Sequence, residues 1–298
     1  MDKLVLIDGN AILHRAFHAL PPLTTRNGEA VNAIYGLVSM LLKVIQDLKP
    51  THLALVFDEK EKTFRQIEYP EYQANRPPME EDLSSQFDKA RKFLDAARIP
   101  IYSMPGYEAD DVIGTISAGQ TKVDEVIIVT GDRDILQLVN NKIKVFMPVL
   151  GLTNAKLFGP LEVAEKMGVG PEKIIDYKAL VGDPSDNYPG VPGIGPKTAI
   201  TLLIKYGNLD EIYNNLNEIS VGFKDKLEKG KDSGYLSRKL ATIVRNVPID
   251  FDYKQCSKWQ LDNQKVLNLF EEFGFRTLTD RIKKIGKQIE DEKQLKLL

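Results

Sequence analysis

The sequence contains a single cysteine, Cys256, and three histidines among its 298 residues. One cysteine excludes a disulfide framework and a zinc site built on cysteines, and it is consistent with a reducing compartment. The chain has no apolar run that approaches the ~20 residues needed to span a bilayer, and its first residues become acidic too early for a signal peptide. We therefore expect a soluble intracellular protein whose chemistry depends on residues other than Cys.

Charge is also close to balanced. The formal net charge is −2, from 40 basic and 42 acidic residues, so the total does not by itself indicate a nucleic-acid-binding protein. Hydrophobic residues make up 43% of the chain, which is enough to bury a substantial core in one large domain or two.

Short continuous apolar runs alternate with amphipathic stretches in the first half of the chain. The runs that read as buried strands cover residues 4–7, 53–57, 99–104, 126–129 and 143–147. Helical periodicity lies between them, at residues 30–48 and 84–97. This alternation predicts an α/β fold with a mostly parallel central sheet flanked by helices.

Strand patterns nearly stop after residue 158, and helical patterns replace them. We predict an α/β core over residues 1–158, a helical part over 159–285 and a charged, frayed tail over 286–298. Residues 59–79 have no apolar periodicity, and arginines alternate with aromatic residues and prolines there. A segment this long without its own core is either functional or mobile.

Acidic residues follow the predicted strands. The carboxyl ends of parallel strands meet at one edge of a sheet, so side chains that follow them become neighbours. Residues 108–111 contain three carboxylates and begin the helix after the third strand. Taken alone, this stretch has a purely structural interpretation as a well-capped acidic helix start. Nine acids converge in this prediction: Asp8, Asp58, Glu108, Asp110, Asp111, Asp132, Asp134, Asp183 and Asp186.

Nine clustered carboxylates would repel one another strongly unless cations were bound among them. Oxygen ligands without His or Cys favour Mg²⁺ or Mn²⁺, and several carboxylates suit a pair of ions about 3.5–4 Å apart, as in phosphodiester cleavage. Setting these nine aside from the 42 acids leaves 33 against 40 bases, a charge of +7 for the remainder. An acidic pit within a basic surface is typical of a nuclease.

Two further segments indicate contacts with phosphate. The glycine-rich stretch 190–199 lies between two predicted helices, where backbone N–H groups at a helix start and Lys197 can hold a DNA phosphate. In the aperiodic segment, Arg65 and Arg76 can bind phosphates and Tyr72 can stack on an unpaired base, although a solvated surface loop would have the same composition.

These motifs together resemble a known family. Ile7-Asp-Gly-Asn10, Val56-Phe-Asp58, Tyr107-Glu-Ala-Asp-Asp-Val-Ile-Gly114, Thr130-Gly-Asp-Arg-Asp134, Gly182-Asp-Pro-Ser-Asp-Asn187 and the hairpin at 190–199 occur in the order found in the 5′-nuclease domain of bacterial DNA polymerase I. That domain belongs to the flap endonuclease superfamily, with its PIN-like fold. The resemblance covers about residues 1–285.

The resemblance implies a divalent-metal-dependent 5′→3′ exonuclease and 5′-flap endonuclease. All nine acids match metal positions: Asp8, Asp58, Glu108, Asp110 and Asp111 around the first ion, Asp132 near both, and Asp134, Asp183 and Asp186 at the second. Residues 59–82 match an arch over the 5′ strand, and 176–204 match a helix-hairpin-helix that often carries K⁺. The implied DNA contacts are Arg15, Arg65, Tyr72, Gln73, Arg76, Gly190, Gly193, Gly195, Lys197 and Thr198.

By the same resemblance the partners are 5′-flapped or nicked DNA and RNA primer–DNA junctions. The implied setting is a monomer that works with a polymerase and a ligase in the bacterial cytosol. One departure stands out, because the family usually has a lysine where this chain has Gln73 in the arch. Gln73 brings no charge to the transition state, so we expect slower or altered cleavage.

Two alternatives remain open at this point. Loss of the arch lysine would suit a catalytically weakened, structure-specific DNA-binding module. The fold would also suit a phosphatase with Asp8 as its nucleophile. Such a phosphatase requires a second aspartate two residues later, where this sequence has Asn10. Fold alone cannot separate these, so the site has to.

Overall fold

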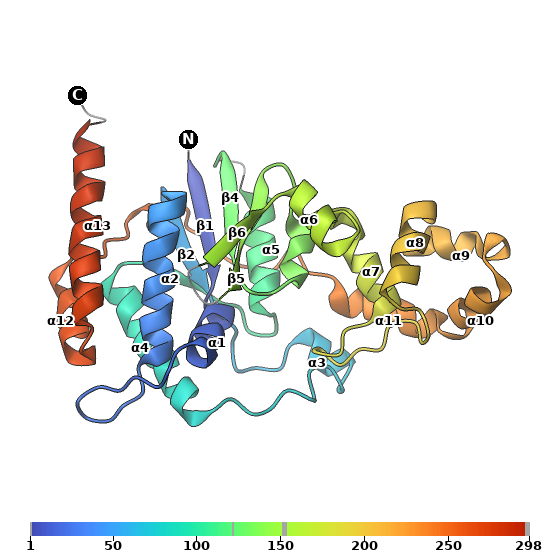
Figure 1. Ribbon diagram of the computed structural model, residues 1–298, viewed down its shortest axis with the longest axis horizontal. Helices are drawn as coiled ribbons and strands as arrows, with labels where there is room; N and C mark the ends of the chain where they lie inside the picture. Colours follow the sequence, from blue (N-terminus) through green and yellow to red (C-terminus); the bar gives the residue numbers. More distant parts are fainter. Residues whose placement is uncertain (1, 121, 151–153, 296–298) are drawn as a thin grey trace.

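The computed structural model describes residues 2–120, 122–150 and 154–295. A six-stranded sheet lies at its centre in the order β3-β2-β1-β4-β5-β6 (Figure 1). The strands are β1 (Lys3–Asp8), β2 (His52–Val56), β3 (Ile101–Tyr102), β4 (Glu125–Val129), β5 (Ile143–Leu150) and β6 (Asn154–Phe158). β1 to β5 pair in parallel and β6 is antiparallel to β5, which confirms the predicted α/β fold.

The central strands read as continuous apolar runs because helices cover both faces of the sheet. Alternate residues of a strand point to opposite faces, and β1 sends Val5 and Ile7 into one core and Leu4 and Leu6 into the other. The first face is covered by α1 (Gly9–Ala19), α2 (Asn32–Leu48) and α4 (Glu81–Ala96). The second is covered by α5 (Ala109–Gly119), a 3₁₀ turn (Asp134–Leu138), α6 (Pro160–Met167) and α7 (Ile174–Val181).

The strand β6 was not predicted. Exposed and half-buried residues alternate along it until its last residue, Phe158, which is buried in the core. Such a strand carries little apolar signal, and its place depends on pairing with β5. In the other direction, the strand predicted over residues 99–104 shortens to Ile101–Tyr102 at the edge of the sheet.

The predicted helical part is divided between two places. α8 (Pro196–Tyr206), α9 (Leu209–Asn214), α10 (Val221–Lys229) and α11 (Lys231–Ala241) extend away from the sheet (Figure 1). α12 (Gln264–Phe273) and α13 (Arg276–Leu295) instead lie at the opposite end, beside α2 and α4. Residues from α12 and α13, among them Phe270 and Ile282, belong to the same core as β1 and β2, so a single helical unit over 159–285 is not what forms.

The prediction of a frayed tail from residue 286 is wrong as far as residue 295. α13 continues through this region, and residues 296–298 lie outside the described part. Leu278, Ile282 and Ile285 are buried and anchor the helix against the core, which allows the charged residues beyond them to continue it. Among the described residues, no helix combines the length and apolarity that a membrane crossing needs.

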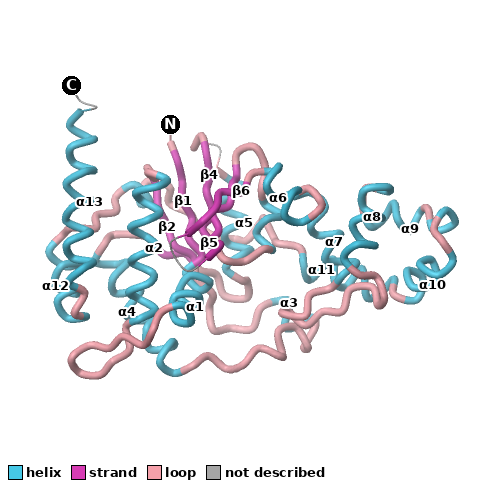
Figure 2. The backbone as a smooth tube through the Cα atoms, in the orientation of Figure 1, coloured by secondary structure: helices cyan, strands magenta, loops and turns pink. Residues whose placement is uncertain are grey.

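The segment between β2 and α4 is mostly loop, as its composition indicated (Figure 2). A short helix, α3 (Phe64–Glu68), and a turn over residues 70–76 interrupt it, and α4 begins at Glu81, within the predicted 59–82 arch. We call residues 59–80 the arch segment.

Candidate active site

Two strand-end aspartates form one side of the site, and each accepts a hydrogen bond from a backbone N–H group at the start of a helix. Asp8 is buried at the end of β1, where Oδ1 accepts from Ala11 N at 2.9 Å and caps α1. Its Oδ2 accepts from Thr130 Oγ1 at 2.8 Å. Asp58 follows β2, and its Oδ1 accepts from Ala109 N at 2.7 Å at the start of α5. Helix N-termini therefore hold both carboxylates in place.

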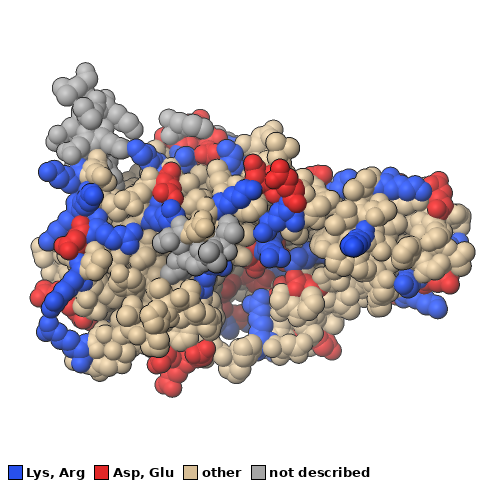
Figure 3. Space-filling view, viewed as in Figure 1, with Lys and Arg blue, Asp and Glu red and all other residues tan. Residues whose placement is uncertain are grey.

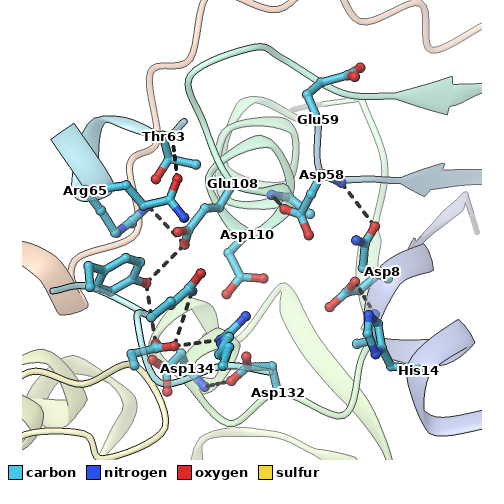
Figure 4. A pocket seen from close by; sticks show the side chains of 18 of the residues that line it. Asp8, His14, Asp58, Glu59, Thr63, Arg65, Glu108, Asp110, Asp132 and Asp134 are labelled. Atoms are coloured by element: carbon cyan, nitrogen blue, oxygen red, sulfur yellow. Dashed lines mark hydrogen bonds and ion pairs between the residues drawn. The ribbon is translucent and has the colours of Figure 1, made fainter. Parts of the chain in front are cut away.

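The start of α5 adds two carboxylates to the same pocket. Glu108 is the N-cap residue and Asp110 lies in the first turn. Figure 4 shows the Asp110 side chain facing Asp8, Asp58 and Asp132 across an open space, and the Glu108 side chain at the edge of that space, directed toward Arg65. The pocket has a volume of about 640 Å³, large enough for ions and a phosphate group. The space-filling view shows acidic side chains in a recess with basic ones around it (Figure 3).

Three of these acids have raised pKa values. Burial raises the pKa of Asp8 to about 7, and the neighbouring Asp58 and Asp132 add to the shift. Burial raises the pKa of Glu108 to about 7 as well. Burial and then Asp132 and Asp8 raise the pKa of Asp110 far above its usual range. The negative charges therefore destabilise one another, and a bound cation would relieve that repulsion.

Asp134, Asp183 and Asp186 form a second cluster beside the first. One carboxylate oxygen from each lies within 4.8 Å of the other two. Asp132 joins the two clusters, because its Oδ1 accepts from Asp134 N at 2.8 Å. Burial raises the pKa of Asp134 to about 7, with Asp132 as the next cause.

The residues fit divalent cations. All the ligand atoms are carboxylate oxygens, which suit Mg²⁺ and Mn²⁺. Glu108 Oε1 is buried and has no hydrogen-bond partner among the described residues. A bound cation would supply the partner that this oxygen lacks. Asp8, Asp58, Glu108, Asp110 and Asp132 would hold one ion, and the second cluster would hold another.

Asp111 departs from the prediction. It is fully buried, points away from the pocket and offers both oxygens to Arg65, at 2.7 and 2.8 Å. Oδ1 also accepts from Val244 N at 2.8 Å and Oδ2 from Glu108 N at 3.1 Å. With its oxygens occupied, Asp111 is a structural carboxylate, and eight of the nine predicted acids remain for metal ions. Asp110 lines the pocket, and Glu108 lies between the pocket and Arg65, with its Oε2 3.3 Å from Arg65 Nη1.

Arg65 and Tyr72, which were predicted to contact DNA, are both buried and line the inner side of the pocket. Arg65 is 2% exposed, and it also donates to the carbonyl oxygens of Leu240 and Thr242 at 2.8 Å. Tyr72 stacks on Tyr188 with a 10° interplanar angle. Both residues hold the arch segment onto the rest of the protein. The sequence pattern could not distinguish this from a solvated loop.

Sequence reasoning missed the cation beside the second cluster. Lys178, on α7, forms ion pairs with both Asp134 and Asp183. Burial lowers the pKa of its ammonium, but the two carboxylates more than offset this and raise the value above the ordinary one. The one available signal was its position in the last turn of a helix, five residues before Asp183.

The predicted helix-hairpin-helix is confirmed as α7, a turn and α8. Gly182 and Gly190 both have positive φ, and a Cβ on Gly190 would meet Gly182 N at 2.2 Å. The close approach of these two backbone segments therefore requires glycine. Gly195 is the N-cap of α8, and Lys197 is exposed in its first turn. Lys226 Nζ donates to Gly193 O at 3.3 Å in the same turn.

A mostly parallel α/β sheet with one carboxylate cluster at its strand ends, a second cluster beside it and a helix-hairpin-helix defines a nuclease fold and site. The chain belongs to the 5′–3′ exonuclease family. Residues 3–168 match the model of the 5′-3′ exonuclease N-terminal resolvase-like domain, and residues 169–264 match the 5′-3′ exonuclease C-terminal SAM fold. The predicted family and enzyme class are confirmed.

Curated relatives are DNA polymerases I. That of Caldicellulosiruptor bescii is 43% identical over 284 residues, which is 94% of this chain and 33% of the relative. That of Bacillus subtilis is 39% identical over 295 residues, 98% of this chain and 34% of the relative. The chain therefore spans about a third of the length of these relatives.

Solved structures share the fold. A bacteriophage T5 5′-exonuclease with bound zinc ions has a TM-score of 0.65 at 20% identity, over 97% of this chain and 98% of the other. A bacteriophage T5 flap endonuclease in a complex with DNA and metal ions has a TM-score of 0.66 at 21% identity, over 96% and 99%. Their sequences are too distant to show more than the architecture.

Proposed function

We propose that this chain hydrolyses DNA phosphodiesters at 5′ ends and 5′ flaps with two divalent cations, Mg²⁺ or Mn²⁺. One observation supports this most directly. Five carboxylates (Asp8, Asp58, Glu108, Asp110 and Asp132) face one pocket, and a second cluster of three lies next to it. This arrangement matches what a two-ion phosphodiester site requires. The family membership and the DNA-bound structural neighbour agree with it.

The protein's own residues would position the reaction. Bound cations would supply Lewis acidity and lower the pKa of an attacking water. The helix caps on Asp8 and Asp58 fix two ligand carboxylates before substrate arrives, which reduces the reorganisation needed in the transition state. Asp8 has both oxygens hydrogen-bonded at its inner side, which disfavours it as a covalent nucleophile. Nothing in the described residues favours a DNA-binding module without catalysis.

Two elements would hold the DNA. The free N–H groups at the start of α8, with Lys197, would bind a phosphate of the duplex without reading its sequence. K⁺ at the hairpin would require Lys226 to leave the Gly193 carbonyl. Arg15 from α1 and the arch residues Gln73 and Arg76 would approach the strand near the pocket. The arch segment would pass over the 5′ single strand.

We propose a biological role that the relatives support. We infer removal of RNA primers and repair of nicked or flapped DNA, by a monomer in the bacterial cytosol that works with a polymerase and a ligase. The DNA polymerase I relatives support this role, and it is a proposal because the chain matches a third of their length.

A cleavage assay tests the proposal. A 5′-labelled flap, a nicked duplex and an RNA–DNA junction are incubated with Mg²⁺, with Mn²⁺ or with EDTA, and product lengths are read on a gel. We expect short 5′ products with either ion and none with EDTA. Asp8→Asn serves as the inactive control. A protein that binds the flap tightly and yields no product with either ion would be a binding module instead.

A further inference from the structure

The second carboxylate cluster already holds two of the protein's own cations. The ammonium of Lys178 forms ion pairs with Asp134 and with Asp183. The guanidinium of Arg76 donates from Nη2 to Asp186 Oδ1 at 2.6 Å. Each of the three carboxylates that would hold the second divalent ion thus has a cationic side chain as its partner.

The two cations differ in burial. The Lys178 side chain is 11% exposed, and α7 brings it to the site from the helical side. The Arg76 side chain is 54% exposed and comes from the arch segment. The first cluster has fewer cationic side chains in direct contact with its carboxylates. Arg65 lies 3.3 Å from Glu108 Oε2, and no ion pair to Asp8, Asp58, Asp110 or Asp132 occurs within the described residues.

Charge arithmetic then separates the two positions. The second cluster carries three negative charges against two positive groups in direct contact. In the first cluster only Glu108 has a cation in direct contact, and Arg76 acts on Asp58 from further away. A divalent ion entering the second position must displace or repel Lys178 and Arg76. An ion entering the first position meets mostly uncompensated carboxylates, which attract it.

We propose that Lys178 and Arg76 are resident counter-cations of the second ion position, so that the second divalent ion binds more weakly than the first until they are displaced. Lys178 acts as a positioning residue that holds Asp134 and Asp183 together in the ion-free protein. This inference rests on the proposed function, because it assumes that the cluster binds a divalent ion.

Arg76 couples this position to the arch segment. The turn that carries it is held on the Asp186 loop by Gln73 N, which donates to Asp186 O at 2.9 Å, and by Gln73 Nε2, which donates to Asp186 Oδ1 at 3.2 Å. Asn75 Nδ2 adds a bond to Asn187 Oδ1 at 2.9 Å. A DNA strand that draws Arg76 onto its own phosphates would remove the cationic partner of Asp186 and leave it only neutral hydrogen-bond donors. The second ion would therefore load best when the arch segment has engaged DNA.

Calorimetric titration with Mn²⁺, without DNA, tests the proposal on the whole chain. For wild type we expect one tighter and one weaker binding event. Lys178→Met keeps the aliphatic stem and removes the charge, and we expect it to tighten the weaker event by about tenfold or more, as removing a contacting like charge should. Lys144→Met is the matched control, because Lys144 pairs with Glu125 at 2.7 Å, outside both clusters.

Two additions keep the test informative. Lys178→Arg retains the charge, and we expect its weaker event to stay near that of wild type. Arg76→Gln is exposed enough to fold whatever happens at Lys178, and it should tighten the same event. Unchanged second-ion affinity in both Lys178→Met and Arg76→Gln overturns the inference while leaving the two-ion site intact. Failure of wild type to bind any Mn²⁺ overturns the proposed function with it.

Discussion

Arg65 and Asp111 form a buried bidentate ion pair beside the acidic pocket, with Nη1 to Oδ2 at 2.7 Å and Nη2 to Oδ1 at 2.8 Å. The pair joins the arch segment to the start of α5. Because Asp111 also accepts from Val244 N, it ties in the chain that follows α11 as well. Asp111 therefore joins three segments of the chain, although its place in the sequence resembles that of a metal ligand.

Asp111→Asn should lower the free energy of unfolding by about 3–5 kcal/mol, because it removes the bidentate counter-charge of the buried Arg65 and leaves only the single contact with Glu108 at 3.3 Å. Urea unfolding measures the loss. Asp47→Asn is the control, since Asp47 pairs with Lys43 on the surface of α2 and its loss should cost at most ~0.5 kcal/mol. Full stability with a missing metal-binding event in Asp111→Asn would return this residue to the ligand set.

Asp110→Asn should raise the stability of the metal-free protein and lower its cleavage rate, the reverse of a structural role. Removing one charge from a crowded pocket should stabilise the metal-free protein at pH 8, because burial and the neighbouring Asp132 and Asp8 raise the pKa of Asp110. Cleavage should fall by at least about 100-fold, more than the loss of an outer-shell partner costs. Flap binding, measured by fluorescence anisotropy, should change little. Retained cleavage would remove Asp110 from the ligand set.

The stability of the metal-free protein should fall as pH rises. The folded-state pKa values of Asp8, Glu108 and Asp134 are about 7, above the ordinary value near 4. The folded state therefore holds more protons than the unfolded state between these limits, so its stability is full at low pH and is lost as pH rises through 7. We expect the Tm in EDTA to drop by about 5 °C or more from pH 5 to pH 8.

Mg²⁺ should restore the Tm at pH 8 and have little effect at pH 5, because ions bind the ionised carboxylates and protons compete with them. Differential scanning fluorimetry across the pH series, with EDTA or Mg²⁺, measures both effects. A Tm that rises with pH in EDTA would contradict the crowded-carboxylate account.

Gln73→Lys should accelerate single-turnover cleavage of a flap by about tenfold or more, because it brings a positive charge to the edge of the pocket where the transition state accumulates negative charge. The Gln73 side chain, a neutral amide, donates from Nε2 to Asp186 Oδ1 at 3.2 Å. Asn75→Lys is the control, since it adds the same charge two residues away on the exposed side of the turn. Equal rates for wild type and Gln73→Lys would show that the missing charge does not limit cleavage.

Lys197→Ala should weaken duplex binding without changing the rate at saturating DNA. Loss of one phosphate contact should reduce the slope of log affinity against log salt by roughly 1. Binding isotherms at several salt concentrations measure the slope. Lys205→Ala, at the far end of the same helix, should leave the slope unchanged. An unchanged slope for Lys197→Ala would place the duplex elsewhere.

The acidic site was largely predictable because its ligands obey a local rule. Asp8 and Asp58 follow buried strands, and parallel strands end at the same edge of a sheet whatever the details of packing. The order of apolar runs alone was enough to bring these carboxylates together. Glu108 and Asp110 followed from the helix start that the same pattern predicts.

Other features depend on contacts between residues distant in the sequence. Nothing local separates Asp110 from Asp111, and the difference arises because Arg65, 46 residues away, pairs with one of them. Likewise α12 and α13 have the sequence pattern of ordinary amphipathic helices. Their position beside the sheet depends on packing against α2 and α4, which the sequence pattern does not show.

The sequence by itself determined the α/β sheet, the acidic edge and the hairpin, because strand periodicity, strand-end position and glycine spacing are local properties. Tertiary structure decided which charges remain available. It buried Arg65 and Asp111 as a pair and brought Lys178 between Asp134 and Asp183. Charge pairing depends on distance in space, and a linear pattern of like residues carries no record of which opposite charge will reach them.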